Sequence, residues 1–435
     1  MPSRKKIILL FLSLFLFRLF FGLCQSHWRD YDEKQSYLTG LKFYTTGAWP
    51  YFGPDAAGSE NSFYSQIPGA LEGLMIGLPL YVLPIPETPF ILVNLLSAFG
   101  VLLLAWYIFM RVPGFSFTWL CLWIGIVPWG LHYPTHISNM SYLFFSSILF
   151  FIGFLESVPT FSLKLISLSR ANALMGFSFF WIMQFHLSYV FLVPLALFSL
   201  AVQLRKKGGL KSLFHFLLGS LIPLSFAIPT YLHYGFGRIN SHSGFVTVFN
   251  WDNVLNLYLL LPRFLSLACF ELPSFIGAHT VDRLAFLNSH PWLWIPGAIL
   301  WIGGIAQAVI LLLFWFRRNQ APPGWREIKW LFLMVFAVVY GSFWFTIKPP
   351  LSHIYLVLLP LVMIYSCYVW RFLGENSRLR LWAKVFVLLG FLFQLGYAAA
   401  VPLDDSFSAQ RNLVEKAIQE KNYHLVGERD PRSLY

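Results

Sequence analysis

Apolar runs long enough to cross a membrane recur along almost the whole of this chain. A membrane-spanning helix needs about 20 mostly apolar residues, whereas soluble domains carry about 25% charged residues. The chain has 435 residues, of which 57% are hydrophobic and only 11% are charged. We therefore expect an all-α polytopic membrane protein with about eleven transmembrane helices. The expected spans lie near residues 7–24, 88–110, 115–131, 138–155, 171–186, 188–204, 212–233, 291–316, 327–346, 352–372 and 380–401.

The segment 251–276 is also apolar, but it is interrupted by Pro262, Arg263 and Pro273. Proline removes a hydrogen bond from a helix interior, and a charge near the centre of a bilayer is costly. We interpret this segment as re-entrant or interfacial rather than as a straight span.

Basic residues are concentrated in alternate connections between the expected spans. The net charge is +12, and the basic connections include "QLRKKGGLK" at 203–211, "RR" at 317–318 and "RLR" at 378–380. This alternation follows the positive-inside rule, so we expect a cytoplasmic N-terminus and an outer C-terminus. The charge then orients the protein in the membrane and does not indicate nucleic-acid binding.

Two long segments are expected on the outer side, 25–87 and 234–290. They interrupt a single expected transmembrane domain, 1–401, which is followed by a short outer tail, 402–435. The tail contains an amphipathic pattern near 408–421, and we expect this helix to pack on the outer segments. No internal repeat is evident.

The first outer segment opens with three carboxylates in "HWRDYDEKQSYLTG", namely Asp30, Asp32 and Glu33. Asp30 suits a helix N-cap, and Glu33 three positions later completes a capping-box pattern. Asp32 is not needed for the cap and lies in the first turn, where the helix dipole favours an ionised carboxylate. Such a group can act as a general base toward a hydroxyl. Helix initiation remains the alternative role for Asp30 and Glu33.

The residues that follow have helical periodicity. Tyr37, Leu41 and Tyr44 form an apolar stripe, which predicts an amphipathic helix on the membrane surface that ends at "TTG". The turn formers of "GAWPYFGPD" come next. A second helix is expected from "SQIPGALEGL", with Pro68 in its first turn.

Two stretches resemble a known family. The outward "DE", the tyrosine after it and the "TG-x-W-P" turn resemble the first outer loop of GT-C membrane glycosyltransferases. The likeness is greatest to the protein O-mannosyltransferase and aminoarabinose transferase group, which is glycosyltransferase family 39-like. "KPPLSHIYLVLLPL" at 348–361 resembles a late motif of the same group. The matching residues of the first stretch are Asp32, Glu33, Tyr37, Gly47, Trp49 and Pro50.

The resemblance implies a GT-C-type fold and an inverting glycosyltransferase. The donor would be a polyprenyl-phosphate-linked sugar, and the acceptor a hydroxyl of a lipid, glycan or protein. Asp32 would be the catalytic base with Glu33 beside it, and Tyr37 would contact substrate. The resemblance also implies a place in the bacterial inner membrane, within the cell envelope, with membrane lipids as partners. Neither the sugar nor the acceptor follows from it.

Four further residues are candidates for substrate binding. Lys348 would neutralise the lipid phosphate, although a lysine at the end of a span can also reach the interface simply to be hydrated. Arg263 is a weaker phosphate candidate. His353 and Tyr355 would contact the donor or belong to the aromatic belt at the interface.

Glu72 departs from the family pattern. It stands in "QIPGALEGLMIGLP", where family members often carry "P-P-L". It is expected either to serve as a second acidic residue that contacts substrate or to be a structural hydrogen-bonding group.

No metal or other cofactor is expected. The triplet "DYD" superficially matches a divalent-metal motif, and a divalent metal is the alternative, but the resembled group works without one. His132 and His136 have helical ligand spacing, yet Pro134 lies between them and no third ligand is adjacent. We favour structural or acceptor-binding roles for both.

A transporter or lipid flippase is the main alternative, followed by a non-catalytic assembly factor. A transporter would require ionisable residues near the middle of the membrane and repeat symmetry. Arg18 within the first span requires a partner, which the sequence does not identify.

Overall fold

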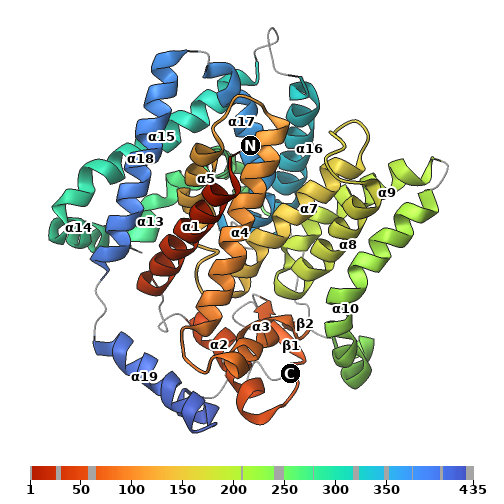
Figure 1. Cartoon of the computed structure of the whole chain (residues 1–435), viewed down its shortest axis with the longest axis vertical. Coiled ribbons are helices and arrows are strands. Elements are labelled where there is room, and N and C mark those ends of the chain that lie inside the picture. Colours follow the sequence, from red (N-terminus) through yellow and green to blue (C-terminus); the bar gives the residue numbers. More distant parts are fainter. Residues whose placement is uncertain are drawn as a thin grey trace. The chain divides into compact units, whose positions relative to one another are not determined.

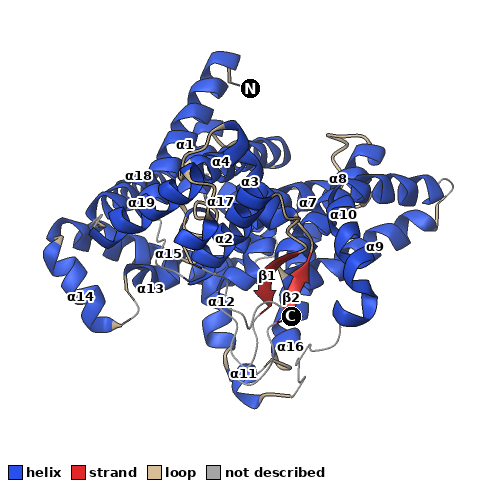
Figure 2. Ribbon diagram, turned by 90° about the horizontal axis from the view of Figure 1, so that it is seen from below, coloured by secondary structure: helices blue, strands red, loops and turns tan. Residues whose placement is uncertain are grey.

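The computed structural model describes residues 2–25, 31–56, 65–206, 209–239, 249–277, 279–316, 323–346, 352–374, 376–401 and 405–427. Helices make up most of these residues, and the strands among them form one antiparallel hairpin, β1 (Phe52–Ala56) with β2 (Ser65–Pro68) (Figure 2). This confirms the all-α prediction. Asp30 and Lys348 lie outside the described residues.

Eight described helices are long and apolar enough to cross a membrane, and each matches an expected span. A bent pair, α12 (Leu257–Leu265) with η3 and α13 (Cys269–Ile276), would make a ninth. The pair is bent by 112° at the break, in agreement with the re-entrant or interfacial interpretation. The eight are Arg4–Gln25, Thr88–Arg111, Asn139–Ser157, Leu187–Leu204, Gly209–Gly235, Pro291–Phe314, Ser352–Leu373 and Ser377–Ala400.

The other three expected spans form helices that are shorter or less apolar. The helix α5 (Phe117–Ile126) has only 10 residues. The helix α8 (Leu168–Phe185) carries Arg170, Asn172 and Gln184, and α16 (Trp325–Phe343) begins with three ionisable residues. Their amino-acid composition alone did not distinguish these three segments from the other expected spans.

The chain divides into two compact units. Unit 1 comprises residues 1–21, 98–133 and 246–401, and unit 2 comprises 22–97, 134–245 and 402–435. In unit 1, α15 packs against α18, and α16 packs against α17 (Figure 1). The helix α15 also packs against α12. The elements of unit 1 not yet given are α1 (Arg4–Gln25), α6 (Pro128–Leu131), α11 (Trp251–Leu255), α14 (Thr280–Ser289), η4 (Pro291–Leu293), α15 (Trp294–Phe314), η5 (Ser352–Leu358), α17 (Leu359–Leu373) and α18 (Ser377–Ala400).

The buried Arg18 of α1 finds its partners where α5 breaks into α6. Its guanidinium donates to the backbone oxygens of Gly125, at 3.1 Å, and Gly130, at 2.6 Å. The N–H of Trp129, which would bond Gly125 in a continuous helix, instead donates to Leu267. The arginine therefore satisfies carbonyl groups that the helix break leaves without their regular partners.

Unit 2 is built on α8, which packs between α7 and α10 (Figure 1). The Gln184 side chain of α8 donates to the backbone of Pro223 in α10 at 2.5 Å. Further elements of this unit are α2 (Tyr31–Thr46), α3 (Leu71–Val82), the start of α4 (Thr88–Arg111), η1 (Asn139–Tyr142), α7 (Leu143–Ser157), η2 (Leu187–Leu192), α9 (Val193–Leu204), α10 (Gly209–Ile239), α19 (Asp405–Gln419) and η6 (Tyr423–Leu425).

The helix α2 confirms the predicted periodicity, because Tyr37, Leu41 and Tyr44 are all buried. It lies very close to α3: a Cβ on Gly40 would sit 2.4 Å from Cγ2 of Ile76. Only glycine fits at that crossing. The predicted start of the second helix was wrong, because Pro68 ends β2 and α3 begins at Leu71. The backbone of Pro68 pairs with Phe52 in the hairpin instead.

The tail helix α19 packs on α2, as expected. Its apolar face, Val414, Ala417 and Ile418, is almost fully buried. Arg411 forms an ion pair with Glu87 at 2.5 Å, just before α4.

Candidate functional site

The first outer segment places the acidic cluster at the start of α2. Asp32 lies in the first turn, but its side chain is outside the described part of the structure. Glu33, the next residue, is buried. Asp32 and Ser36 are four residues apart, so they share one face of the helix.

That face of α2 is held to α3 by a buried carboxylate. The Ser36 hydroxyl donates to Oε1 of Glu72 at 2.7 Å. Glu72 lies in the first turn of α3, where the helix dipole stabilises negative charge, and it is only 1% exposed. This burial favours the structural alternative, in which Glu72 orients α2 rather than touching substrate.

The surroundings of Glu72 are aromatic and tightly packed. Tyr142 lies within electrostatic reach of Glu72, and its ring stacks on Phe185 with centroids 4.8 Å apart. A Cβ on Gly53 would lie 3.7 Å from Oε2 of Glu72 and 3.1 Å from the backbone oxygen of Gln184. The hairpin backbone thus lies beside the carboxylate, and the tight contact that a larger residue at Gly53 would make is with the Gln184 oxygen.

Tyr37 anchors the middle of α2. Its hydroxyl donates to the backbone oxygen of Pro86 at 2.8 Å, and its side chain is 1% exposed. Burial and the nearby Glu87 carboxylate raise the pKa of the Tyr37 phenol well above its ordinary value, and Arg411 opposes this only in part. The phenol therefore stays protonated and acts as a hydrogen-bond donor.

A second polar cluster lies wholly in unit 1, at the bend of the broken helix. Arg263 is in the last turn of α12, and Glu271 closes the following η3 turn. Arg263 and Glu271 form an ion pair through Nε and Oε1, and the hydroxyl of Ser352 donates to Oε2 of Glu271. The Glu271 carboxylate therefore has a partner on each oxygen.

Aromatic residues surround this cluster. Arg263 interacts with the Tyr355 phenol, and the Tyr355 ring packs against Phe264 with centroids 5.0 Å apart. The Tyr133 ring lies edge-on to His353 at 6.1 Å. Burial and Glu271 raise the pKa of the Tyr133 phenol, while Arg263 lowers it.

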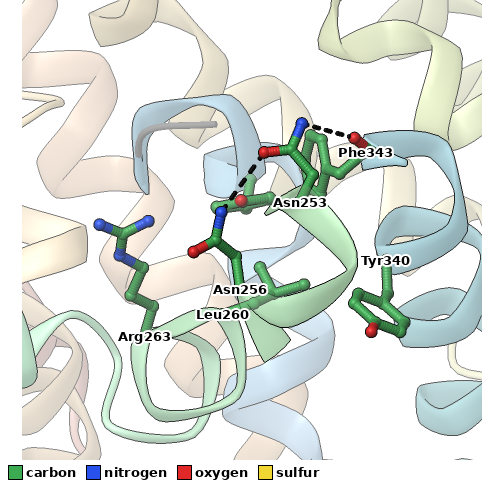
Figure 3. A pocket seen from close by; sticks show the side chains of 7 residues that line it. Asn253, Asn256, Leu260, Arg263, Tyr340 and Phe343 are labelled. Atoms are coloured by element: carbon green, nitrogen blue, oxygen red, sulfur yellow. Dashed lines mark hydrogen bonds between the residues drawn. The ribbon is translucent and has the colours of Figure 1, made fainter. Parts of the chain in front are cut away.

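A small pocket opens beside Arg263 (Figure 3). The amide of Asn253 donates to the backbone oxygen of Phe343 at 2.9 Å, and the amide of Asn256 donates to Oδ1 of Asn253 at 3.3 Å. The full lining is Asn253, Asn256, Leu260, Arg263, Tyr340, Phe343 and Tyr355.

The structure thus brings together two of the four donor-binding candidates, Arg263 and Tyr355. His353 follows Ser352 in the chain and its ring lies against that of Tyr133. Lys348, the fourth, lies outside the described residues. Sequence reasoning missed Glu271 and Ser352. A signal for Glu271 was present, since it is the one acid in residues 253–276 and follows the one arginine of that stretch by eight residues.

A guanidinium beside a phenol and side-chain amides is suited to bind an anion. Arginine donates several N–H groups in a fixed plane that matches carboxylate and phosphate oxygens. Among the described residues, no three His, Cys, Asp or Glu side chains are grouped as metal ligands. His132 is buried and bonds Gln394 at 3.1 Å, which suits the structural one of the two roles favoured for it.

No protein-family model matches the chain, and no curated protein matches it. A crystal structure of ArnT from Cupriavidus metallidurans, bound to undecaprenyl phosphate, aligns over 98% of this chain and 75% of that chain. The two are 12% identical, and the TM-score is 0.44. These values do not establish a shared family.

Proposed function

We propose that the protein is a membrane glycosyltransferase of GT-C type that transfers a sugar from a polyprenyl phosphate to an acceptor hydroxyl at the outer membrane face. The observation that carries the proposal is the polar cluster around Arg263, set into a broken apolar helix and open to a pocket. A lipid-borne phosphate is an anion that can reach such a position within the membrane. The family resemblance of the acidic stretch supports the same reaction.

The proposed reaction is a single displacement with inversion. The Asp32 carboxylate takes the proton of the acceptor hydroxyl, whose oxygen forms a bond to the anomeric carbon. The bond between that carbon and the phosphate oxygen breaks, and polyprenyl phosphate leaves with the electron pair. Because the leaving group is already anionic, it needs positive charge rather than a proton. Arg263 and Lys348 supply that charge in the proposal.

The test compares two chemically identical substitutions two residues apart. Asp32→Asn removes the base and is expected to lower the transfer rate by about 10²–10⁴-fold. Asp30→Asn serves as the matched control, because asparagine caps a helix about as well as aspartate. The assay is sugar transfer from a polyprenyl-phosphate donor by each purified variant. Near-normal rates for both variants would show that the base lies elsewhere, with Glu33 as the next candidate.

A lipid flippase is the competing function, and the 112° bend of the α12–α13 pair favours it, because transporters often use broken helices. A flippase would move polyprenyl-phosphate sugar between leaflets of a vesicle without consuming it. Measuring both the sidedness and the chemical identity of the donor separates the two functions.

A further inference from the structure

The guanidinium of Arg263 is already occupied by a carboxylate of the same chain. Glu271 pairs with Arg263. The Glu271 side chain is 11% exposed and the Arg263 side chain is 18% exposed. A partly buried arginine without a partner is destabilising, so Glu271 neutralises it in the ligand-free protein. Any phosphate that binds Arg263 meets a competing anion.

The backbone is shaped to hold that competitor in place. Leu267 and Ala268 have φ values of 54° and 64°, a left-handed conformation that is uncommon outside glycine. The Ala268 N–H donates to the backbone oxygen of Arg263 at 3.0 Å, and the Glu271 N–H donates to that of Ala268 at 3.0 Å. Both turn residues are completely buried. The turn reverses the chain so that Glu271 returns to Arg263.

Ser352 gives Glu271 a second partner. Its hydroxyl bonds the carboxylate oxygen that does not face Arg263. If Glu271 loses contact with Arg263, the carboxylate keeps one hydrogen bond and is not left unsatisfied. Ser352 therefore makes exchange at Arg263 less costly.

We propose that Glu271 is an internal counter-anion that competes with the lipid phosphate for Arg263, and that Ser352 retains the displaced carboxylate. This inference rests on the proposed function. The donor is a phosphodiester with one negative charge, whereas the product is a phosphate monoester with a charge near −1.5 to −2 at neutral pH. Competition by Glu271 weakens the binding of donor and product alike, and it matters most for the product, whose higher charge would otherwise hold it more strongly at Arg263 and slow its release.

The experiment measures binding of undecaprenyl phosphate to the full chain in nanodiscs, with undecaprenol as the uncharged control. Glu271→Gln keeps the shape and the acceptor oxygen but removes the charge. We expect it to bind undecaprenyl phosphate about 10-fold more tightly, from the strength of hydrogen bonds to charged groups. Ser352→Ala is expected to bind about 3-fold more weakly, because the displaced carboxylate then lacks its second partner.

The outcomes separate the two proposals. A wild-type protein that binds undecaprenyl phosphate no better than undecaprenol contradicts the proposed function. A wild-type protein that does discriminate, together with unchanged or weaker binding by Glu271→Gln, overturns the counter-anion role alone. In an Arg263→Ala background the gain from Glu271→Gln should vanish, and a persisting gain would show that it does not act through Arg263. If Glu271→Gln does not fold, tighter or unchanged binding by Ser352→Ala overturns the inference.

Discussion

Removing the hydroxyl that holds α2 to α3 tests whether Glu72 is a structural group. Ser36→Ala deletes the donor of the 2.7 Å bond to the Glu72 carboxylate. Both side chains are buried, at 6% and 1% exposure, so water cannot readily replace the lost donor. Hydrogen bonds to charged groups contribute about 1.5–3 kcal/mol. We expect Ser36→Ala to lower the free energy of unfolding by about that amount.

Glu72→Gln should behave differently. The amide oxygen still accepts the Ser36 hydrogen bond, and a neutral amide is less costly to bury than a carboxylate. We therefore expect a change below about 1 kcal/mol. The matched control is Thr45→Ala, which removes a half-buried hydroxyl on the same helix that bonds only backbone, 2.8 Å from the oxygen of Leu41. Thr45→Ala should lower the free energy of unfolding by less than Ser36→Ala does.

The assay is unfolding in mixed micelles of increasing denaturing detergent, followed by the transfer rate of each folded variant. Because Ser36 lies one turn from Asp32, its loss should also lower the rate without abolishing it. Stability of Ser36→Ala within about 0.5 kcal/mol of wild type would refute the reasoning. So would a complete loss of transfer by a stable Glu72→Gln, which would make Glu72 part of the chemistry.

Three further results are expected. Arg18→Met should destabilise the protein by about 2 kcal/mol or more in the same assay, because two carbonyls lose their donor; an unchanged midpoint would contradict the assigned partners. Arg411→Ala should lower the free energy of unfolding by only about 0.5–1 kcal/mol, since the pair with Glu87 is partly exposed. Lys416→Ala removes a far more exposed pair with Glu420 and should have no measurable effect. A reporter active only outside the cytoplasm should work when fused after residue 401, and activity of a cytoplasmic reporter there would reverse the predicted orientation.

Hydrophobic periodicity predicted those helices whose buried face is made of regularly spaced or continuous apolar residues. The stripe of Tyr37, Leu41 and Tyr44 located α2, and the apolar runs located all eight candidate spans. The start of α3 was misplaced because Pro68 is equally compatible with a strand end and a first helical turn. Pairing with Phe52 decides between them, and such pairing is not a local property of the sequence.

Side-chain partners were less predictable than helices. Arg263 and Tyr355 were identified one by one, but the polar cluster that Arg263 forms depends on a bend. The two residues of that bend, Leu267 and Ala268, give no sign of a left-handed turn. A glycine there would have indicated it. The same bend explains why the partnership between Arg263 and Glu271 was missed.

The position of Arg18 has a consequence for synthesis. Its two acceptors follow it by 107 and 112 residues, so at roughly 5–20 residues per second the ribosome takes about 5–20 s to make them. For that interval α1 carries a charge before these two acceptors exist, and the long side chain can extend toward the bilayer surface to be hydrated. The first helix of the chain therefore cannot reach its final depth and packing until the break between α5 and α6 has been made.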